Sequence, residues 1–210
     1  MRRTLPLLAA VSIFAITGCA ADEAPTAGAK VAFYGDSYTL GTGATAQGDR
    51  WSTVVSEKRG WNEFNPSVNG LGFFNNRDGL DLPGQVIEFD PDIVFVTMGL
   101  NDNFSYDEHA EEIRTQLDAD FDRLASELPD ARLIVVEPFW YTDARPESVE
   151  VIIGWVKDAA ARVDADYISG ASHWIEGHPE WMAFDGLHPN SDGYAEMAKR
   201  MDAALVELGL

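Results

Sequence analysis

The sequence has little cysteine and little positive charge. Cys19 is the only cysteine among 210 residues, so an intramolecular disulfide is excluded. The 15 lysine and arginine residues are outnumbered by 35 aspartate and glutamate residues, which gives a formal net charge of -20 at pH 7. A surface this acidic repels nucleic acid and anionic lipid headgroups, and it argues against a polyanionic substrate. We therefore expect no nucleic-acid partner.

Long apolar runs are also scarce, and the most apolar stretch lies at the start of the chain. Met1-Arg2-Arg3 is followed by an apolar segment over residues 5–16, which is too short to span a bilayer comfortably. A basic start, a short apolar segment and small residues around Gly18 are typical of an export signal. We predict that residues 1–18 form this signal and do not belong to the folded domain.

The end of this segment, Ile16-Thr17-Gly18-Cys19, resembles the lipobox of bacterial lipoproteins, in which the cysteine becomes the lipidated first residue. The resemblance implies a lipid on Cys19, and two acyl chains suffice for stable anchoring. An ordinary export signal with an incidental cysteine is the alternative. Residues 19–29 are small and polar and predict a flexible tether. We thus expect an exported protein, anchored to the membrane through Cys19 on its extracytoplasmic side.

Residues 30–210 alternate between short apolar runs and amphipathic patterns, which predicts one domain of the doubly wound α/β class. Nearly continuous apolar runs are typical of parallel strands that are covered on both faces. Strands are expected at residues 31–34, 93–98, 133–137 and 167–168, with a further strand at Val68 and the residues just before it. Apolar residues at helical spacing predict helices over residues 113–128, 149–163 and 194–208.

In such a sheet the ligand site lies beyond the carboxyl ends of the strands. Ser37 follows the first predicted strand, Asn101 follows the strand at residues 93–98, and residues 185–188 precede the last helix. All three are therefore expected at the same edge of the sheet.

Four short segments at this edge carry the groups of an acyl-transfer site. A hydrolytic serine needs a base that takes its proton, an acid that orients the base, and donors that hold an oxyanion. Each segment alone is weak evidence, whereas the four in this order are strong evidence. The segments are Gly35-Asp36-Ser37, Asn69-Gly70-Leu71-Gly72, Gly99-Leu100-Asn101-Asp102 and Asp185-Gly186-Leu187-His188.

We predict that Ser37 is the nucleophile, because the glycines around it let the backbone bend sharply and expose the hydroxyl. A serine that merely caps a turn is the alternative. His188 is the predicted base, because Asp185 can reach its Nδ1 and leave Nε2 to face Ser37. For the remaining histidines we expect no such local partner and a position on the surface or in loops: His109, His173 and His178.

The predicted oxyanion donors are the side-chain amide of Asn101, the backbone N–H of Ser37, and a glycine near Gly70 or Gly72. An Asx-turn residue is the alternative for Asn101. Asp102 is expected to support the loop rather than to take part in the chemistry.

These segments resemble those of the GDSL-type, or SGNH, hydrolase family, whose four named residues are a serine, a glycine, an asparagine and a histidine in that order. The resemblance covers essentially all of residues 30–210. It implies a flavodoxin-like three-layer α/β/α sandwich with about five parallel strands, and it implies neither a metal nor an organic cofactor. Residue by residue, it assigns catalysis to Ser37, Asp185 and His188, and the oxyanion hole to Ser37, Gly72 and Asn101.

Two positions depart from the family pattern. Tyr38 stands where the family usually has leucine after the serine. The glycine block is one residue shorter than the common pattern, so Gly70 is an alternative to Gly72, which we prefer.

The family includes lipases, lysophospholipases, thioesterases and polysaccharide deacetylating esterases, and the fold does not choose among them. We expect a cell-surface esterase that acts on short acyl esters, such as O-acetyl groups on a glycan. Aromatic residues near the active edge either stack on sugar rings, line an acyl pocket or pack in the core: Trp140, Tyr141, Trp174 and Trp181.

Two other classes of function stay open at this point. One is a glycan-binding or scaffold lipoprotein without catalysis, although such a module has no physical need for the complete set of reactive groups. The other makes Asp185 and His188 metal ligands, but the sequence has no further histidine or cysteine cluster to complete a coordination shell.

Overall fold

The computed structural model describes residues 28–210, so the predicted export signal, the lipidation site Cys19 and most of the predicted tether lie outside the described residues. Five strands form one parallel sheet in the order β2-β1-β3-β4-β5. This is the strand order of flavodoxin-like sheets, and it confirms the predicted fold class. The strands are β1 (Lys30–Gly35), β2 (Asn62–Phe64), β3 (Ile93–Thr97), β4 (Arg132–Val136) and β5 (Asp166–Ile168).

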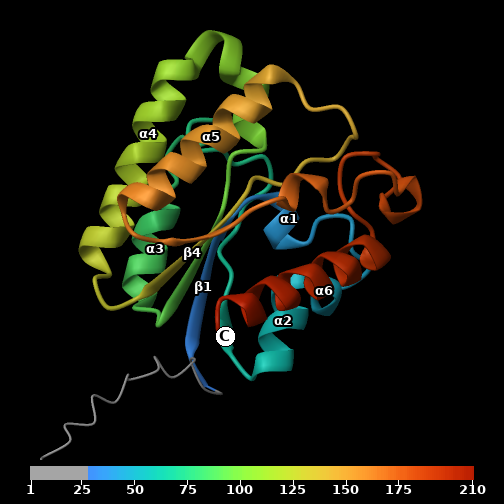
Figure 1. Cartoon of the computed structure of the whole chain (residues 1–210), viewed down its shortest axis with the longest axis horizontal. Coiled ribbons are helices and arrows are strands. Elements are labelled where there is room, and N and C mark those ends of the chain that lie inside the picture. Colours follow the sequence, from blue (N-terminus) through green and yellow to red (C-terminus); the bar gives the residue numbers. More distant parts are fainter. Residues whose placement is uncertain (1–27) are drawn as a thin grey trace, which may run out of the picture.

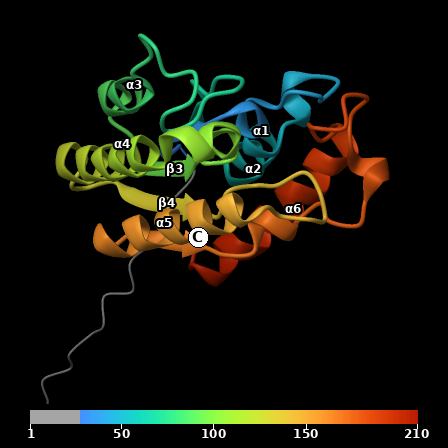
Figure 2. The same ribbon diagram turned by 90° about the horizontal axis from the view of Figure 1, so that it is seen from above.

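Helices cover both faces of this sheet (Figure 1). Helices α2 and α6 pack together on one face, and α3, α4 and α5 lie on the other, as the view from above also shows (Figure 2). The α-helices within residues 28–210 are α1 (Ser37–Leu40), α2 (Trp51–Arg59), α3 (Leu82–Phe89), α4 (Tyr106–Glu127), α5 (Glu147–Arg162) and α6 (Ser191–Glu207).

Each strand contributes to two hydrophobic clusters because successive side chains point to opposite faces. In β1, Val31 and Phe33 pack toward α2 and α6, whereas Ala32 and Tyr34 pack toward α3 and α4. These side chains are fully buried, which explains the nearly continuous apolar character of the run.

The three predicted amphipathic segments are helices α4, α5 and α6. The strand prediction at Val68 was wrong. The additional strand in this part of the chain is β2, which ends at Phe64. Pro66 lies between them and has no N–H with which to continue the ladder. Val68 instead donates one backbone hydrogen bond, of 3.3 Å, to Gly35 at the end of β1.

The described chain enters the domain at the amino end of β1, opposite the edge where the reactive groups are expected (Figure 1). Gly28 donates a backbone hydrogen bond to Gly60, and Ala29 accepts one from Asn62, so the last two residues of the predicted tether contact the domain. Of the helices within residues 28–210, none combines the length and the apolar character that crossing a membrane requires.

Candidate active site

Ser37 lies where β1 turns into α1. Asp36 caps this short helix by accepting the N–H of Tyr38 at 2.9 Å, and Ser37 is its first helical residue. Gly35 is required just before the turn, because a Cβ there would lie 2.4 Å from the Thr97 hydroxyl oxygen on β3. Ser37 is only 3 % exposed, and within residues 28–210 neither its Oγ nor its N–H makes a hydrogen bond.

Asn101 follows β3, and its side-chain amide points toward the serine segment. Its Nδ2 donates to the carbonyl of Leu71 at 3.0 Å and to Oδ2 of Asp36 at 3.3 Å. The predicted oxyanion residue therefore connects the serine segment with the glycine segment. Three of the four predicted segments meet around this one amide.

Asp102 holds the glycine segment in place, as the predicted supporting role requires. Its carboxylate is fully buried and accepts backbone N–H groups from Phe73 at 2.7 Å, Phe74 at 2.9 Å and Asn75 at 3.3 Å. Burial raises the pKa of Asp102, although these three N–H groups act in the opposite direction. A Cβ on Gly72 would lie 2.4 Å from this carboxylate, so only glycine fits there.

The two candidate glycines differ in how their N–H groups are used. The Gly72 N–H donates to the carbonyl of Asn75 at 2.8 Å. The Gly70 N–H has no acceptor within residues 28–210, and Gly70 adopts a left-handed φ of +72°. Gly72 remains the predicted donor from the family pattern, but it must exchange its bond to Asn75 before it can hold an oxyanion. Gly70 needs no such exchange.

Asp36 is the second buried carboxylate at this site. It is 1 % exposed, and burial raises its pKa to about 7, with Asp102 nearby adding to the rise and the Tyr38 N–H opposing it. Asp36 also contacts the amide of Asn101 through its Oδ2. Its protonation state therefore bears directly on the orientation of that amide.

Asp185 and His188 lie on a tight loop. Met182 and Pro189 close the loop by an antiparallel bridge. Oδ2 of Asp185 lies 2.6 Å from Nδ1 of His188, and Oδ1 accepts the N–H groups of Leu187 at 2.9 Å and His188 at 3.0 Å. The contact with the His188 ring lowers the pKa of Asp185 to about 2, so the carboxylate stays ionised at neutral pH. This pair has the local geometry that was predicted from its spacing.

Tyr38 connects the serine turn with the histidine loop. Its hydroxyl donates to the carbonyl of Leu187 at 2.6 Å, and its ring lies 6.1 Å from the ring of His188 and stacks on Phe139. The usual leucine of the family could not donate this bond. Ser37 and His188 do not share a hydrogen bond in this structure, and such bonds often form only once substrate is bound.

The expectation that the other histidines lack a carboxylate partner was wrong for His173 and His178. His173 contacts Glu176, and His178 contacts Glu180 at 2.8 Å, while His109 lies 3.7 Å from Glu112. A neighbouring carboxylate therefore does not distinguish His188. Its distinction is the loop contact with Tyr38, which only the tertiary structure shows.

Two of the four aromatic residues near the active edge belong to the core. Trp140 is 3 % exposed and Trp174 is 8 % exposed, and both pack in the cluster under α6. Tyr141 and Trp181 are only partly buried. Of the four, only these two are open to a ligand.

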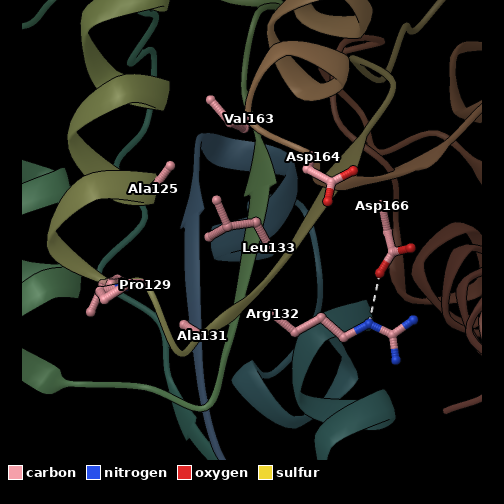
Figure 3. A pocket seen from close by; sticks show the side chains of 9 residues that line it. Ala125, Pro129, Ala131, Arg132, Leu133, Val163, Asp164 and Asp166 are labelled. Atoms are coloured by element: carbon pink, nitrogen blue, oxygen red, sulfur yellow. Dashed lines mark hydrogen bonds and ion pairs between the residues drawn. The ribbon is translucent and has the colours of Figure 1, made fainter. Parts of the chain in front are cut away.

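A groove of about 530 Å³ lies beside the histidine loop, between the segment after β4 and residues 175–186. A smaller pocket of about 240 Å³ lies at the opposite edge of the sheet, around the Arg132–Asp166 ion pair at the amino ends of β4 and β5 (Figure 3). The groove is thus on the predicted active edge, and the smaller pocket is not. No group of three or more metal-ligating side chains occurs within the part of the chain that the structure describes.

A serine, a carboxamide and a hydrogen-bonded aspartate–histidine pair at the carboxyl edge of a parallel sheet together define a candidate acyl-transfer site. The sequence matches the GDSL-like Lipase/Acylhydrolase family over residues 33–196, more than half of its length. The chain therefore belongs to this family, which confirms the resemblance seen in its motifs.

Individual relatives agree with this membership. The chain is 27 % identical over 193 residues to GDSL lipase Rv0518 of Mycobacterium tuberculosis, and the match covers 86 % of this chain and 82 % of that protein. The esterase EstA of Pseudoalteromonas sp. superposes with a TM-score of 0.70 at 17 % identity, covering 85 % of this chain and 97 % of EstA. The acetylxylan esterase Axe2 of Geobacillus stearothermophilus gives a TM-score of 0.64 at 20 % identity, covering 88 % and 96 %. At these identities the two structures show a shared fold.

Proposed function

We propose that this carboxylic ester hydrolase is a serine esterase that removes short acyl groups, such as O-acetyl groups on glycans, at the cell surface. The observation that carries the proposal is the convergence of Ser37, Asn101 and the Asp185–His188 pair at one edge of the sheet, with Tyr38 bonded across to the histidine loop. A module without chemistry has no physical reason to hold all of these groups together.

In the proposed reaction, Ser37 Oγ attacks the ester carbonyl carbon while His188 Nε2 takes the serine proton. Asp185 stabilises the imidazolium that forms, and its low pKa keeps it ionised for this task. When the tetrahedral intermediate collapses, the bond to the alcohol oxygen breaks and that oxygen receives the proton from His188. A water molecule then attacks the acyl-serine by the same steps, which releases the acid and restores Ser37.

In the proposed reaction the oxyanion is held by N–H groups that are either free or able to exchange an existing hydrogen bond. The Ser37 N–H has no acceptor among residues 28–210, and Asn101 Nδ2 can exchange its longer bond, to Asp36, for one to the oxyanion. The third donor is Gly72 after release of Asn75, or Gly70 directly. Each donor of this kind is typically worth about 3 kcal/mol of barrier height.

The charge of the chain and the activity of one protein with this fold indicate which substrates to test first, although the fold itself does not choose among them. The formal charge of -20 disfavours anionic lipid surfaces. The fold is shared with an acetylxylan esterase, which makes acetylated sugars the first substrates to test.

The proposed location is the outer side of the membrane, with a lipid on Cys19. The domain receives its chain at the amino edge of the sheet, so the reactive groups lie at the far edge from the anchor (Figure 1). Residues 19–27, the part of the predicted tether before the two residues that contact the domain, would span about 17 Å on average as a flexible chain. This arrangement presents the site to polymers outside the membrane. Mass spectrometry of the mature amino terminus tests it, and an unmodified Cys19 would rule the anchor out.

The catalytic proposal is tested with the purified protein and its Ser37→Ala variant on p-nitrophenyl esters of increasing chain length. We expect cleavage of the acetate, slower turnover of longer esters, labelling of Ser37 by a fluorophosphonate probe, and loss of at least about 10⁴-fold of the activity in Ser37→Ala. Preference for long chains would move the assignment to lipase or lysophospholipase, and preference for thioesters to thioesterase. A folded protein that neither labels nor hydrolyses any ester would be a binding module.

A further inference from the structure

Phe184 is a fully exposed phenylalanine directly before Asp185. Its exposure is 109 % of the reference value, and it is one of three large apolar side chains classed as exposed within residues 28–210. The loop that carries it cannot easily fold it away, because the Met182–Pro189 bridge and a 2.8 Å bond from Ala183 N–H to the His188 carbonyl close the loop beneath it. A single exposed apolar side chain is common on protein surfaces and carries no argument alone. Phe184 differs because it also lines a groove.

The ring forms part of the wall of the 530 Å³ groove. That volume lies in the range of about 300–1,000 Å³ that is common for small-molecule sites. The groove is walled on one side by residues 141–143 and on the other by residues 175–186, segments that lie side by side at the active edge in both views (Figures 1 and 2). It thus adjoins the loop that carries His188.

The position of the groove indicates whether it can bind the acyl half or the alcohol half of an ester. In the proposed reaction the oxygen of the alcohol half must receive its proton from His188, whereas the acyl carbonyl oxygen points to Ser37 and Asn101. The alcohol half therefore extends toward the histidine loop. A groove lined by Ala183, Phe184 and Gly186 lies on that side.

The lining of the groove combines apolar side chains, among them Tyr141, Ile175 and Met182, with the polar side chains of Asp143 and His178. Oδ1 of Asp143 accepts the N–H of Gly177 at 2.8 Å, which leaves its Oδ2 without a partner in the described residues. Two residues outside the lining hold the His178 ring in place: Trp181 stacks on it with centroids 3.6 Å apart, and Glu180 contacts its Nδ1. A hydrocarbon chain in this groove would desolvate these polar groups without pairing them. A sugar ring offers both apolar C–H faces and hydroxyl donors.

We propose that this groove is the subsite for the alcohol half of the ester and that its occupant is a neutral sugar ring, stacked on Phe184 and hydrogen-bonded by Asp143. The carboxylates of Asp143 and Asp185 around the groove disfavour an anionic sugar. This inference rests on the proposed esterase function and adds to it the group that recognises the substrate.

The test compares two acetate esters that differ in the alcohol half: an acetylated xylo-oligosaccharide and vinyl acetate, whose alcohol half has only two carbons. In Phe184→Ala we expect about a tenfold rise in KM for the acetylated sugar and less than a twofold change for vinyl acetate. Asp143→Ala should show the same split. Phe104→Ala, which removes another exposed phenylalanine that does not line the groove, is the matched control and should leave both esters unchanged.

An equal loss on both esters, or no loss on either, would overturn the subsite. So would a Phe184→Ala variant that loses binding to neutral phosphatidylcholine vesicles but keeps its KM for the acetylated sugar, since the ring would then serve a membrane contact. The proposed esterase function fails separately. It falls if the wild-type protein hydrolyses neither vinyl acetate nor the sugar ester, whereas the subsite alone falls if vinyl acetate is hydrolysed and the variants behave like wild type.

Discussion

Ser37, Asn101 and the two carboxylates beside them are almost completely buried, whereas the loop that carries Asp185 and His188 is open to solvent. The exposed fractions are 3 % for Ser37 and 7 % for Asn101, against 14 % for the His188 side chain and 47 % for the Asp185 side chain. The serine side is built from strand ends and buried hydrogen bonds. The histidine side is built from short-range bonds within one loop.

Because of this difference in burial, the two sides should respond differently to amino-acid substitution. On the buried side, a polar group that loses its partner costs stability, because water cannot replace the bond. On the exposed side, water can replace a lost hydrogen bond, so only the orientation of the imidazole is lost. We therefore expect substitutions on the serine side to affect folding and activity together, and those on the histidine side to affect activity alone.

The largest expected effect comes from Asp185→Asn. Its amide cannot hold the His188 tautomer that leaves Nε2 as a base, so kcat should fall by about 10³- to 10⁴-fold. The free energy of unfolding should change by less than about 0.5 kcal/mol because the side chain is half exposed. Steady-state kinetics and urea unfolding measure the two quantities.

The matched control for Asp185→Asn is Glu176→Gln, which alters an exposed carboxylate–histidine contact away from Ser37, the one with His173. It should change kcat less than twofold. If both variants lost activity equally, the special role of the Asp185–His188 pair would be refuted.

On the buried side, Asp102→Asn should lower the free energy of unfolding by about 3 kcal/mol, because one carboxylate satisfies three backbone N–H groups there. Loosening of the glycine segment should also reduce kcat by about 10- to 100-fold. Unfolding and kinetics are measured on the same preparation. A variant as stable as wild type would show that the buried side is not built as we describe.

Asp36→Asn sharpens the comparison through pH. The pKa of Asp36 is raised from 3.8 to about 7 in the folded protein, so the folded state holds its proton more tightly than the unfolded chain does. The contribution of Asp36 to the free energy of unfolding is therefore fully present below the pKa of 3.8 that it has in the unfolded chain, and it is lost as pH rises through about 7.

Between about pH 5 and about pH 8, wild type should lose stability relative to Asp36→Asn, as urea unfolding at both pH values would show. The amide should also misorient Asn101 and lower kcat about tenfold. A stability difference that does not depend on pH would contradict the raised pKa.

The smallest effect is expected where the two sides are joined. Tyr38→Phe removes the bond to the Leu187 carbonyl and should cost about 1 kcal/mol of stability. It should lower kcat severalfold with little change in KM, since the histidine loop loses its bond to the serine turn. Tyr167→Phe is the control, because the Tyr167 hydroxyl is buried without a partner within the described residues. Equal kinetics for both variants would mean that the Tyr38 bond does not position the loop.

Much of the fold was predictable because the strong signals are local. Each predicted strand or helix buries apolar side chains that lie close together in the sequence. This holds for the strands β1, β3 and β4 and for the helices α4, α5 and α6. Helices α2 and α3 were not anticipated, since they span only 9 and 8 residues and their apolar faces are short. For α3 a signal existed in Asp81, which caps the helix, and Pro83 in its first turn.

The sequence predicted the individual residues of the site but not the contacts that join the serine turn to the histidine loop. The spacing of Asp185 and His188 predicted their contact correctly, because three residues on one loop leave few other arrangements. The bond of Tyr38 to Leu187 and the exposure of Phe184 at the groove were not predicted. A tyrosine in the place of the usual leucine was the available signal for the first, and a phenylalanine directly before Asp185 for the second.

By itself, the sequence determined which chemical groups exist and that they stand at the ends of buried strands and in glycine turns. Those properties depend on local backbone geometry and on hydrophobic burial, which follow from neighbouring residues. Only the tertiary structure decided that Tyr38 reaches Leu187, that the Gly72 N–H is taken by Asn75, and that Trp140 is buried while Phe184 is exposed. Such contacts depend on how separate loops pack at the sheet edge, and no local pattern encodes that packing.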